Sequence, residues 1–261
     1  MTPPSGRGTL SALRAEWNAG KAAFGAWCSI PSAATIEWFC VPGIRYACLD
    51  QQHGFFDDLT LVDGIRAIER CGALPLVRVA MNVPWMVGKA LDAGAAGVIV
   101  PMVEDGADAA AAVAACRYPP GGSRSYGPTR AQLFNKPETA RGFEDVLCFV
   151  MIETERGLIN ADEIARTPGL DGIYVGPSDL TLALGSATLA GPESALLHEP
   201  IEQIAAACRQ NGVIAGIHCV DGNSAARFAA RGFQLVTCFK DTSLIANAAL
   251  REVAFLTPRP G

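Results

Sequence analysis

The stretch Leu76–Asp105, LVRVAMNVPWMVGKALDAGAAGVIVPMVED, contains one complete structural repeat of the chain. Its first apolar run, rich in β-branched residues, predicts a strand over Leu76–Ala80, and the segment that follows predicts a helix over Pro84–Ala93. A glycine-containing turn then leads into a second apolar run, Gly97–Met102. A strand, a helix and another strand in succession form the unit from which parallel sheets are built.

The same alternation continues along nearly the whole chain. Eight segments are predicted as strands: Ala23–Ser29, Arg45–Asp50, Leu76–Ala80, Gly97–Met102, Leu147–Glu153, Gly172–Val175, Val213–Ile217 and Gln234–Phe239. Helices are predicted at Ala33–Cys40, Leu59–Cys71, Pro84–Ala93, Asp105–Cys116, Asn160–Arg166, Ser178–Leu184, Ile201–Asn211, Asn223–Arg231 and Ser243–Val253. Continuously apolar strands are typical of a parallel sheet that is covered on both faces. Eight of them in 261 residues predict an α/β fold, the (β/α)8 TIM barrel.

An open doubly wound sheet is disfavoured, because no strand is followed by the G-x-G-x-x-G turn of its nucleotide site. No linker divides the chain, so residues 1–261 are expected to form a single domain, with an N-terminal arm or helix over 1–20 and a C-terminal helix and tail over 241–261. The segment Arg117–Val146 is dense in Gly, Pro, Ser and Arg, and it is predicted as a long active-site loop over the barrel mouth. Arg124 and Arg130 could bind an anionic substrate there. The alternative is that this segment is an exposed loop that binds no ligand.

The composition excludes several classes of partner. The chain has 26 acidic and 21 basic residues, a net charge of −5, and no basic block, so neither a nucleic acid nor an anionic membrane is expected as a partner. A small diffusible ligand is expected instead. Nine scattered cysteines without a C-x-x-C pair predict reduced thiols in a cytoplasmic protein. The amino terminus lacks a signal-peptide pattern, and no apolar run reaches the roughly 20 residues of a membrane span.

In a (β/α)8 barrel, polar residues at the carboxyl ends of the strands face the active site. Residues of this kind are Asp50, His53, Arg78, Glu104, Asp105, Glu153, Asp179, His218, Lys240 and Asp241. Glu153 and Asp179 follow neighbouring strands, and two carboxylates on one rim suit a hard divalent cation. Each has another possible role, because Asp179 could cap a helix and Glu153 could pair with Arg156. Taken together, the two favour a metal site.

Three further features of these strand ends suggest catalysis or anion binding. His53, with Asp50 as a carboxylate partner, is a candidate general base, whereas an ordinary hydrogen-bonded role is favoured for His218. Arg78 stands in an apolar strand, where its charge requires a core carboxylate or an anionic ligand as a partner. The N–H groups after Gly176 and at Ser178 open a predicted helix and could bind an anion.

Five motifs together resemble the HpcH/HpaI family of metal-dependent pyruvate aldolases. They are HGFFDD, PLVRV with the MNVPWMVGKALDAGAAGVIVPMVED that follows it, CRYPPGGSRSYG, MIETERGLIN and DGIYVGPSDLTLALG. The resemblance runs from Phe24 to Leu250. The family includes 4-hydroxy-2-oxoheptanedioate aldolase and 2-dehydro-3-deoxyglucarate aldolase. The resemblance implies a carbon–carbon lyase that reversibly cleaves a 4-hydroxy-2-oxo acid to pyruvate or hydroxypyruvate and an aldehyde, through a metal-stabilised enolate.

The resemblance also implies a role for each site residue. Glu153 and Asp179 would hold Mg²⁺, Mn²⁺ or Co²⁺. His53, supported by Asp50, would be the base acting through a metal-bound water, and Arg78 would hold the donor and stabilise the enolate oxygen. The backbone around Gly176, Pro177 and Ser178 would bind the donor carboxylate, and Trp27 would line the pocket.

The chain departs from the family pattern at two positions. Gln52 replaces a glutamate that is common before the active-site histidine, and Met151 replaces a common glutamine. The family also implies a homohexamer, a trimer of dimers that exchange a C-terminal helix. The apolar segment Ser243–Val253 is suited to this exchange, although packing against its own barrel is the alternative.

Three other functions remain open on the sequence. Lys240 at a strand end would suit an aldolase that forms a Schiff base. A citrate-lyase-type barrel acting on a CoA ester is the nearest enzymatic neighbour. The changes at Gln52 and Met151 also leave open a non-catalytic barrel that binds an oxo acid.

Overall fold

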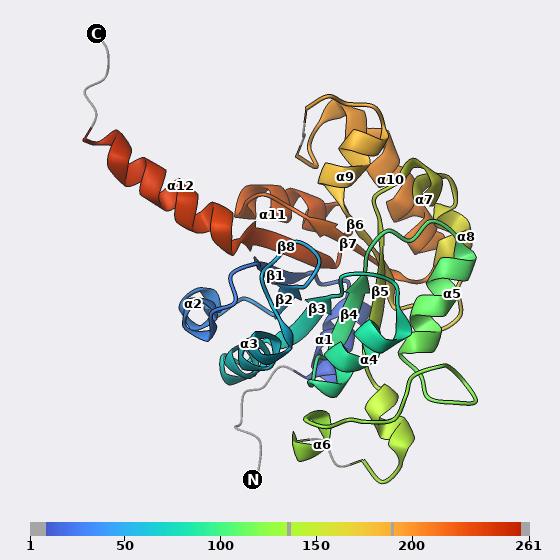
Figure 1. Cartoon of the computed structure of the whole chain (residues 1–261). Helices are drawn as coiled ribbons and strands as arrows, with labels where there is room; N and C mark the ends of the chain where they lie inside the picture. The colour runs from blue at the N-terminus through green and yellow to red at the C-terminus, as the bar shows by residue number, and fades with distance from the viewer. Residues whose placement is uncertain (1–8, 135–136, 189–190, 257–261) are drawn as a thin grey trace.

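Eight parallel strands close into a barrel in chain order, which confirms the predicted (β/α)8 fold (Figure 1). The computed structural model describes residues 9–134, 137–188 and 191–256. The strands are β1 (Ala23–Cys28), β2 (Tyr46–Asp50), β3 (Leu74–Arg78), β4 (Gly97–Val100), β5 (Leu147–Ile152), β6 (Gly172–Val175), β7 (Ile214–His218) and β8 (Leu235–Lys240). All eight predicted strands are therefore present, with ends displaced by at most two residues.

Helices surround this barrel. They are α1 (Leu10–Asn18), α2 (Ala33–Phe39), α3 (Asp58–Arg70), α4 (Pro84–Asp92), α5 (Gly106–Ala115), α6 (Ala131–Phe134), α7 (Glu155–Ile159), α8 (Ala161–Ala165), α9 (Pro177–Ala183), α10 (Ala195–Asn211), α11 (Gly222–Ala230) and α12 (Asp241–Ala254). A short 3₁₀ helix covers Ala140–Glu144. Within the described ranges, no helix has both the length and the apolar character needed to cross a membrane.

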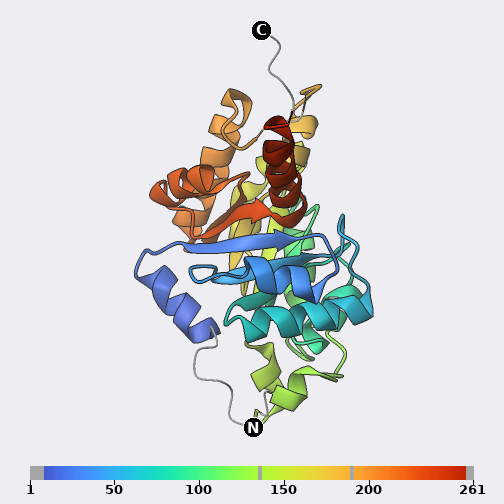
Figure 2. The same ribbon diagram turned by 90° about the vertical axis from the view of Figure 1, so that its left-hand side faces the viewer.

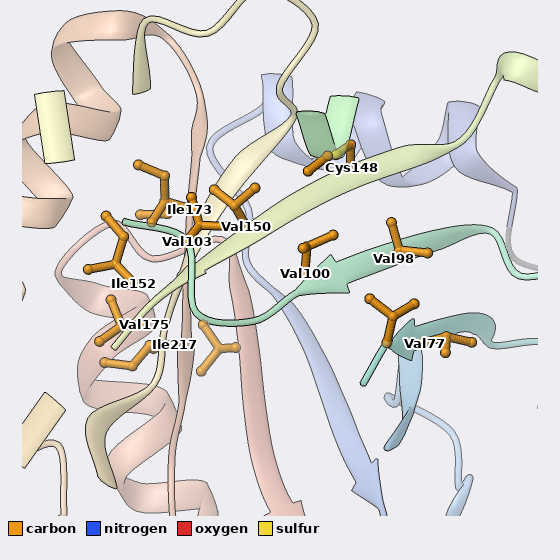
Figure 3. Packing of buried hydrophobic residues seen from close by; sticks show 14 of the residues in the cluster. Val77, Val98, Val100, Val103, Cys148, Val150, Ile152, Ile173, Val175 and Ile217 are labelled. Atoms are coloured by element: carbon orange, nitrogen blue, oxygen red, sulfur yellow. The ribbon is translucent and has the colours of Figure 1, made fainter. Parts of the chain in front are cut away.

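The outer face of the barrel packs against the helices through β-branched side chains. Val98, Val100, Val150, Ile173 and Val175 belong to this layer and are fully buried (Figure 3). The inner face is equally apolar over most of its height. Burial on both faces explains why the strands read as continuous apolar runs.

A layer of large aromatic residues fills the barrel below its mouth. Tyr46 and Tyr174 are fully buried, and their hydroxyls share Thr237 Oγ1 at 2.9 and 2.6 Å. Gly25 makes room for this layer, because a Cβ at that position would lie 2.3 Å from the Tyr46 ring. The layer closes the interior, so a ligand can approach only the residues above it.

Helix α1 packs against the amino-terminal end of the barrel. Leu13 and Trp17 are buried against the inner apolar cluster. The Trp17 indole donates to the Gln234 carbonyl at 2.8 Å, and the Gln234 amide donates back to the Trp17 carbonyl at 2.7 Å. This end of the barrel is therefore covered, and the opposite end carries the opening.

The described parts of the segment Arg117–Val146, residues 117–134 and 137–146, lie at the amino-terminal end of the strands, which contradicts the predicted position over the mouth. The segment joins the end of α5 to the start of β5, and Figure 1 shows α6 on the side of the molecule opposite α9. Arg124 donates to Asp92 at 2.7 Å and Arg130 to Glu69 at 2.6 Å. Both arginines are buried, so in the described part of this segment they anchor the chain to α3 and α4.

Helix α12 projects away from the barrel (Figures 1 and 2). Only its first residue, Asp241, is buried, and the Asp241 carboxylate accepts from the backbone N–H groups of Ser29 and Ile30 at 2.8 Å. Its apolar side chains face outward, with Leu250 67% exposed. On this single chain α12 does not fold back over its own barrel.

Helix α10 starts six residues earlier than predicted. Pro200 lies inside this helix, although proline lacks the N–H that a helix interior requires. Helix α7 directly precedes α8, and the sequence prediction does not include it.

Candidate active site

A pocket of about 150 Å³ opens at the carboxyl ends of the strands. It is lined by Trp27, His53, Arg78, Met151, Glu153, Gly176, Pro177, Ser178, Asp179, His218 and Lys240. Of the residues predicted at the strand ends, the lining includes His53, Arg78, Glu153, Asp179, His218 and Lys240. Asp50 is buried beside the pocket, and Glu104, Asp105 and Asp241 are not part of the lining. The strand ends thus bring these side chains together in one pocket, which is the candidate site.

The alternation of side chains along each strand explains this convergence. Successive side chains point to opposite faces, so every second residue of a barrel strand faces inward. In β2, Tyr46 and Cys48 belong to the inner cluster and Asp50 follows two residues later. In β3, Leu74 and Leu76 are followed in the same way by Arg78. The last inward residue of a strand becomes a wall of the pocket.

Arg78 is fixed by a buried ion pair with Asp50. Its Nε donates to Asp50 Oδ1 at 2.9 Å and its Nη2 to Oδ2 at 2.6 Å. Burial by itself would raise the pKa of the Asp50 carboxyl, but the hydrogen bonds and charge of Arg78 hold that pKa below its usual value. The Trp27 indole also donates to Asp50 Oδ2, at 3.1 Å. Asp50 thereby holds two pocket side chains in place.

Asp50 contacts His53 through the backbone. Its Oδ1 accepts from the N–H groups of Gln52 at 3.0 Å and His53 at 3.2 Å. No hydrogen bond joins the Asp50 carboxylate to the His53 ring among the described residues. Asp50 therefore shapes the loop that carries His53, and the imidazole remains exposed at the pocket wall.

Glu153 and Asp179 form a close carboxylate pair. Glu153 is 2% exposed, and its Oε1 accepts from the Met102 N–H at 2.9 Å. Burial raises the pKa of Glu153 to about 7, and the adjacent Asp179 contributes to the rise. Met102 has a φ of 56°, a left-handed backbone that is uncommon outside glycine. Within the described residues, no third Asp, Glu, His or Cys joins the pair to form a larger cluster.

Gly176 permits the close approach of Glu153. A Cβ at Gly176 would lie 2.6 Å from Glu153 Oε2. The Gly176 N–H donates to the Ile152 carbonyl at 3.2 Å, and Pro177 has no N–H. The N–H groups of Ser178 and Asp179, in the first turn of α9, meet no acceptor among the described residues. Within the described ranges, the Ser178 N–H is therefore free, as the sequence suggests, and the Asp179 N–H is a second free donor.

The paired carboxylates fit a hard divalent cation. Two adjacent anions in a largely buried site repel each other unless one of them is protonated or a cation lies between them. The raised pKa of Glu153 comes mainly from burial, and the neighbouring Asp179 carboxylate adds to it. Mg²⁺ and Mn²⁺ prefer oxygen ligands and accept one or two protein carboxylates, with water or substrate completing the set.

His218 and Lys240 complete the far wall of the pocket. The His218 ring meets the Trp27 ring edge-on, with 5.0 Å between ring centres. Burial, together with the charges of Arg78 and Lys240, lowers the pKa of His218 to about 4. The sequence favours an ordinary role for His218, but Ile214, Gly216 and His218 share the inward face of β7. Counting this alternation would have placed His218 in the pocket.

Three other acidic residues at strand ends do not join the site. Glu104 and Asp105 lie near Arg156, at 3.7 and 2.6 Å, and Asp105 also accepts from the N–H of Asp108 in the first turn of α5. Asp241 ties α12 to the end of β1. Among the described residues, Arg156 thus pairs with Glu104 and Asp105 and not with Glu153.

Comparison with known proteins agrees with this architecture. A profile of the HpcH/HpaI aldolase/citrate lyase family matches residues 24–248. A hydroxypyruvate/pyruvate aldolase of Rhizorhabdus wittichii is 35% identical over 246 residues, 94% of this chain and 98% of that protein. A 4-hydroxy-2-oxo-heptane-1,7-dioate aldolase of Shigella flexneri is 31% identical over 243 residues, 92% and 90% of the two chains. The crystal structure of a family protein from Burkholderia cenocepacia superimposes with a TM-score of 0.84 at 29% identity, covering 95% of this chain and 99% of that one.

Proposed function

Because the chain belongs to the HpcH/HpaI aldolase/citrate lyase family, we propose that it is a divalent-metal-dependent aldolase acting on a 4-hydroxy-2-oxo acid. The products are pyruvate or hydroxypyruvate and an aldehyde, and the reaction runs in both directions. One observation carries the proposal: the Glu153–Asp179 carboxylate pair and the fixed guanidinium of Arg78 line the same pocket.

Glu153 and Asp179 hold the metal in this proposal. A bound Mg²⁺, Mn²⁺ or Co²⁺ ion supplies Lewis-acid stabilisation to the oxygens of the oxo acid. Each of these three ions accepts two carboxylates and water as ligands.

The remaining residues bind the donor and stabilise its charge. The Arg78 guanidinium faces the developing negative charge on the C2 oxygen, and its pairing with Asp50 keeps it in one orientation. The Ser178 and Asp179 N–H groups, at the start of α9, bind the donor carboxylate. Trp27 and Met151 supply an apolar wall that excludes water from the reacting carbon atoms.

His53 moves the proton in the cleavage direction. It accepts the proton of the 4-hydroxyl group, and the electron pair left on that oxygen forms the aldehyde carbonyl as the bond between C3 and C4 breaks. The C3–C4 electron pair forms a double bond between C2 and C3, and the C2 carbonyl pair moves onto the C2 oxygen, which gives the enolate. The aldehyde leaves, and protonation of the enolate at C3 gives the oxo acid. In the synthetic direction the same groups form the enolate and add it to the aldehyde.

Proton exchange at C3 of pyruvate in D₂O, followed by NMR, tests the proposal. The purified protein with Mg²⁺ or Mn²⁺ is expected to exchange these protons, and EDTA or the substitution Glu153→Ala is expected to stop the exchange. Hydroxypyruvate is tested in parallel as the second donor. Absence of exchange with both donors would contradict the proposal and favour a CoA-ester lyase or an oxo-acid-binding barrel.

We also propose a homo-oligomer, a hexamer built as a trimer of dimers, in which α12 packs against a neighbouring subunit. The exposed apolar side chains of α12 support this, since helices with such a surface are normally covered. Trp38, Phe55 and Trp85 add exposed apolar surface on the barrel. A cytoplasmic location is proposed because all nine cysteines are free thiols.

A further inference from the structure

Lys240 is a pocket residue whose charge the proposed chemistry does not use. It lies at the end of β8, in register with Trp27 of β1, and lines the pocket. Among the described residues, no carboxylate lies within ion-pair distance of its ammonium group. The pocket's other cation, Arg78, is already paired with Asp50. An unpaired ammonium group in a cavity wall is suited to an anionic ligand.

His218 supplies an uncharged polar group beside Lys240. Its ring nitrogens make no hydrogen bond to the protein in the described part of the chain, and its ring lies against Trp27. Burial and the neighbouring cations keep the imidazole neutral at physiological pH. A neutral imidazole offers one N–H donor and one acceptor.

These two residues come from other strands than the groups that bind the donor. The strands follow chain order around the barrel, so β7 and β8 lie between β6 and β1. The donor-binding groups come from β3, from the end of β5 and from the turn after β6. With the donor held there, the wall formed by His218 and Lys240 remains for the substrate that joins the donor at C3.

We propose that Lys240 and His218 form the acceptor subsite and select an aldehyde that carries a carboxylate. The Lys240 ammonium group binds the carboxylate, and the His218 N–H donates a hydrogen bond to it. This inference rests on the proposed aldolase function and names the substrate class of the same site. A hydrogen bond to a charged group is worth enough to change kcat/KM by about 10- to 100-fold.

Matched aldehydes test this selection. Aldol addition is measured with pyruvate or hydroxypyruvate as the donor and with two pairs of acceptors: glyoxylate against glycolaldehyde, and succinic semialdehyde against butanal. The wild type is expected to prefer the carboxylate-bearing member of at least one pair. In Lys240→Met this preference is expected to fall at least 10-fold, mainly through KM for the acceptor, and Lys240→Arg is expected to retain most of it.

Lys21→Met is the matched control. Lys21 is exposed just before β1, at the opposite end of the barrel, so the substitution removes the same charge away from the pocket. It is expected to leave the preference of the wild type unchanged. His218→Leu is expected to weaken the preference less than Lys240→Met, because it removes a neutral donor.

A binding measurement makes the test independent of turnover. With the metal bound and oxalate occupying the donor position, calorimetric titration compares butyrate with butyramide. Butyrate is expected to bind the wild type at least 10-fold more tightly than it binds Lys240→Met, with butyramide unaffected by the substitution.

Three results would overturn the proposal. The first is an equal loss in Lys240→Met for charged and neutral aldehydes. The second is a loss of acceptor-free C3 exchange as large as the loss of aldol addition, which would place Lys240 at the donor. The third is borohydride trapping of pyruvate on a Lys240 peptide, which would make Lys240 a Schiff-base nucleophile. Failure of the aldolase proposal itself is distinguished by absence of C3 exchange in the wild type.

Discussion

The Asp50 carboxylate and the Arg78 guanidinium face each other across β2 and β3, joined by hydrogen bonds of 2.9 and 2.6 Å. The two residues are register partners at the ends of these strands, and their side chains are 0% and 9% exposed. Planar, bidentate contact of this kind fixes the orientation of the guanidinium as well as its position. The pair therefore presents Arg78 to the pocket in a single pose.

Asp50→Asn is expected to damage both stability and catalysis. It leaves the Arg78 charge buried without its carboxylate, which costs about 3 kcal/mol of unfolding free energy. The freed guanidinium also loses its fixed orientation, so kcat/KM is expected to fall about 100-fold. Urea denaturation and steady-state kinetics measure the two effects.

Asp63→Asn is the control for this substitution. It breaks the exposed pair of Asp63 with Arg66, 3.0 Å apart, and is expected to cost less than about 1 kcal/mol. Equal destabilisation by the two variants would contradict the importance of the buried pair.

Metal binding is expected to strengthen as the pH rises. Burial raises the pKa of Glu153 to about 7, so in the metal-free protein this carboxyl stabilises the fold at low pH and loses that contribution as the pH rises through 7. A metal ion must displace the proton, so affinity is expected to be about 10-fold higher at pH 8 than at pH 6. The shift of the melting temperature by Mn²⁺ at the two pH values measures this.

Glu153→Gln is expected to abolish the Mn²⁺ effect at both pH values, whereas Glu155→Gln, on the exposed face of α7, should preserve it. A Mn²⁺ affinity in the wild type that does not change between pH 6 and pH 8 would contradict the raised pKa of Glu153.

Gly176→Ala is expected to weaken the metal site without unfolding the barrel. The new Cβ would lie 2.6 Å from Glu153 Oε2, so the carboxylate must move. Mn²⁺ affinity measured by calorimetry is expected to fall at least 10-fold. Gly88→Ala serves as the control, since its added Cβ meets no atom within 4 Å among the described residues outside the adjacent backbone of α4. In this helix the substitution should stabilise the protein by up to about 1 kcal/mol. Unchanged affinity in Gly176→Ala would show that Glu153 is not confined by this contact.

Arg124→Met is expected to affect stability alone. Arg124 is buried, donates to Asp92 at 2.7 Å and to the Phe143 carbonyl at 3.1 Å, and packs over Tyr118. Its loss is expected to cost about 3 kcal/mol, because it leaves Asp92 partly buried without its cation. The pyruvate exchange rate and its KM should remain within twofold of the wild type. A large rise in KM would indicate that the segment Arg117–Val146 contributes to the active site after all.

The double substitution Leu250→Glu and Val253→Glu is expected to dissociate the oligomer. Both side chains are exposed on the single chain, and a charge at each position would be costly inside an apolar interface. Light scattering after size-exclusion chromatography should give a multiple of 27.3 kDa for the wild type and a smaller assembly for the variant. A monomeric wild type would contradict the role proposed for α12.

Local patterns were sufficient to predict the barrel. The runs at Gly97–Val100 and Gly172–Val175 are short, rich in β-branched residues and bounded by turns. Such a pattern can be recognised from neighbouring residues alone. Pro200 shows where such reasoning fails, because packing of α10 against the barrel outweighs the hydrogen bond that proline cannot make.

The sequence by itself determined the strand order, the rim that carries the site and the pairing of Glu153 with Asp179, because these follow from periodicity and from the geometry of parallel strands. It left the partner of Arg78 open. The tertiary structure decided that Asp50 pairs with Arg78 and that the Arg124 segment lies at the far end of the barrel. It also decided that His218 and Lys240 share the pocket. These relationships join residues distant in sequence, and only closure of the barrel fixes which side chains meet.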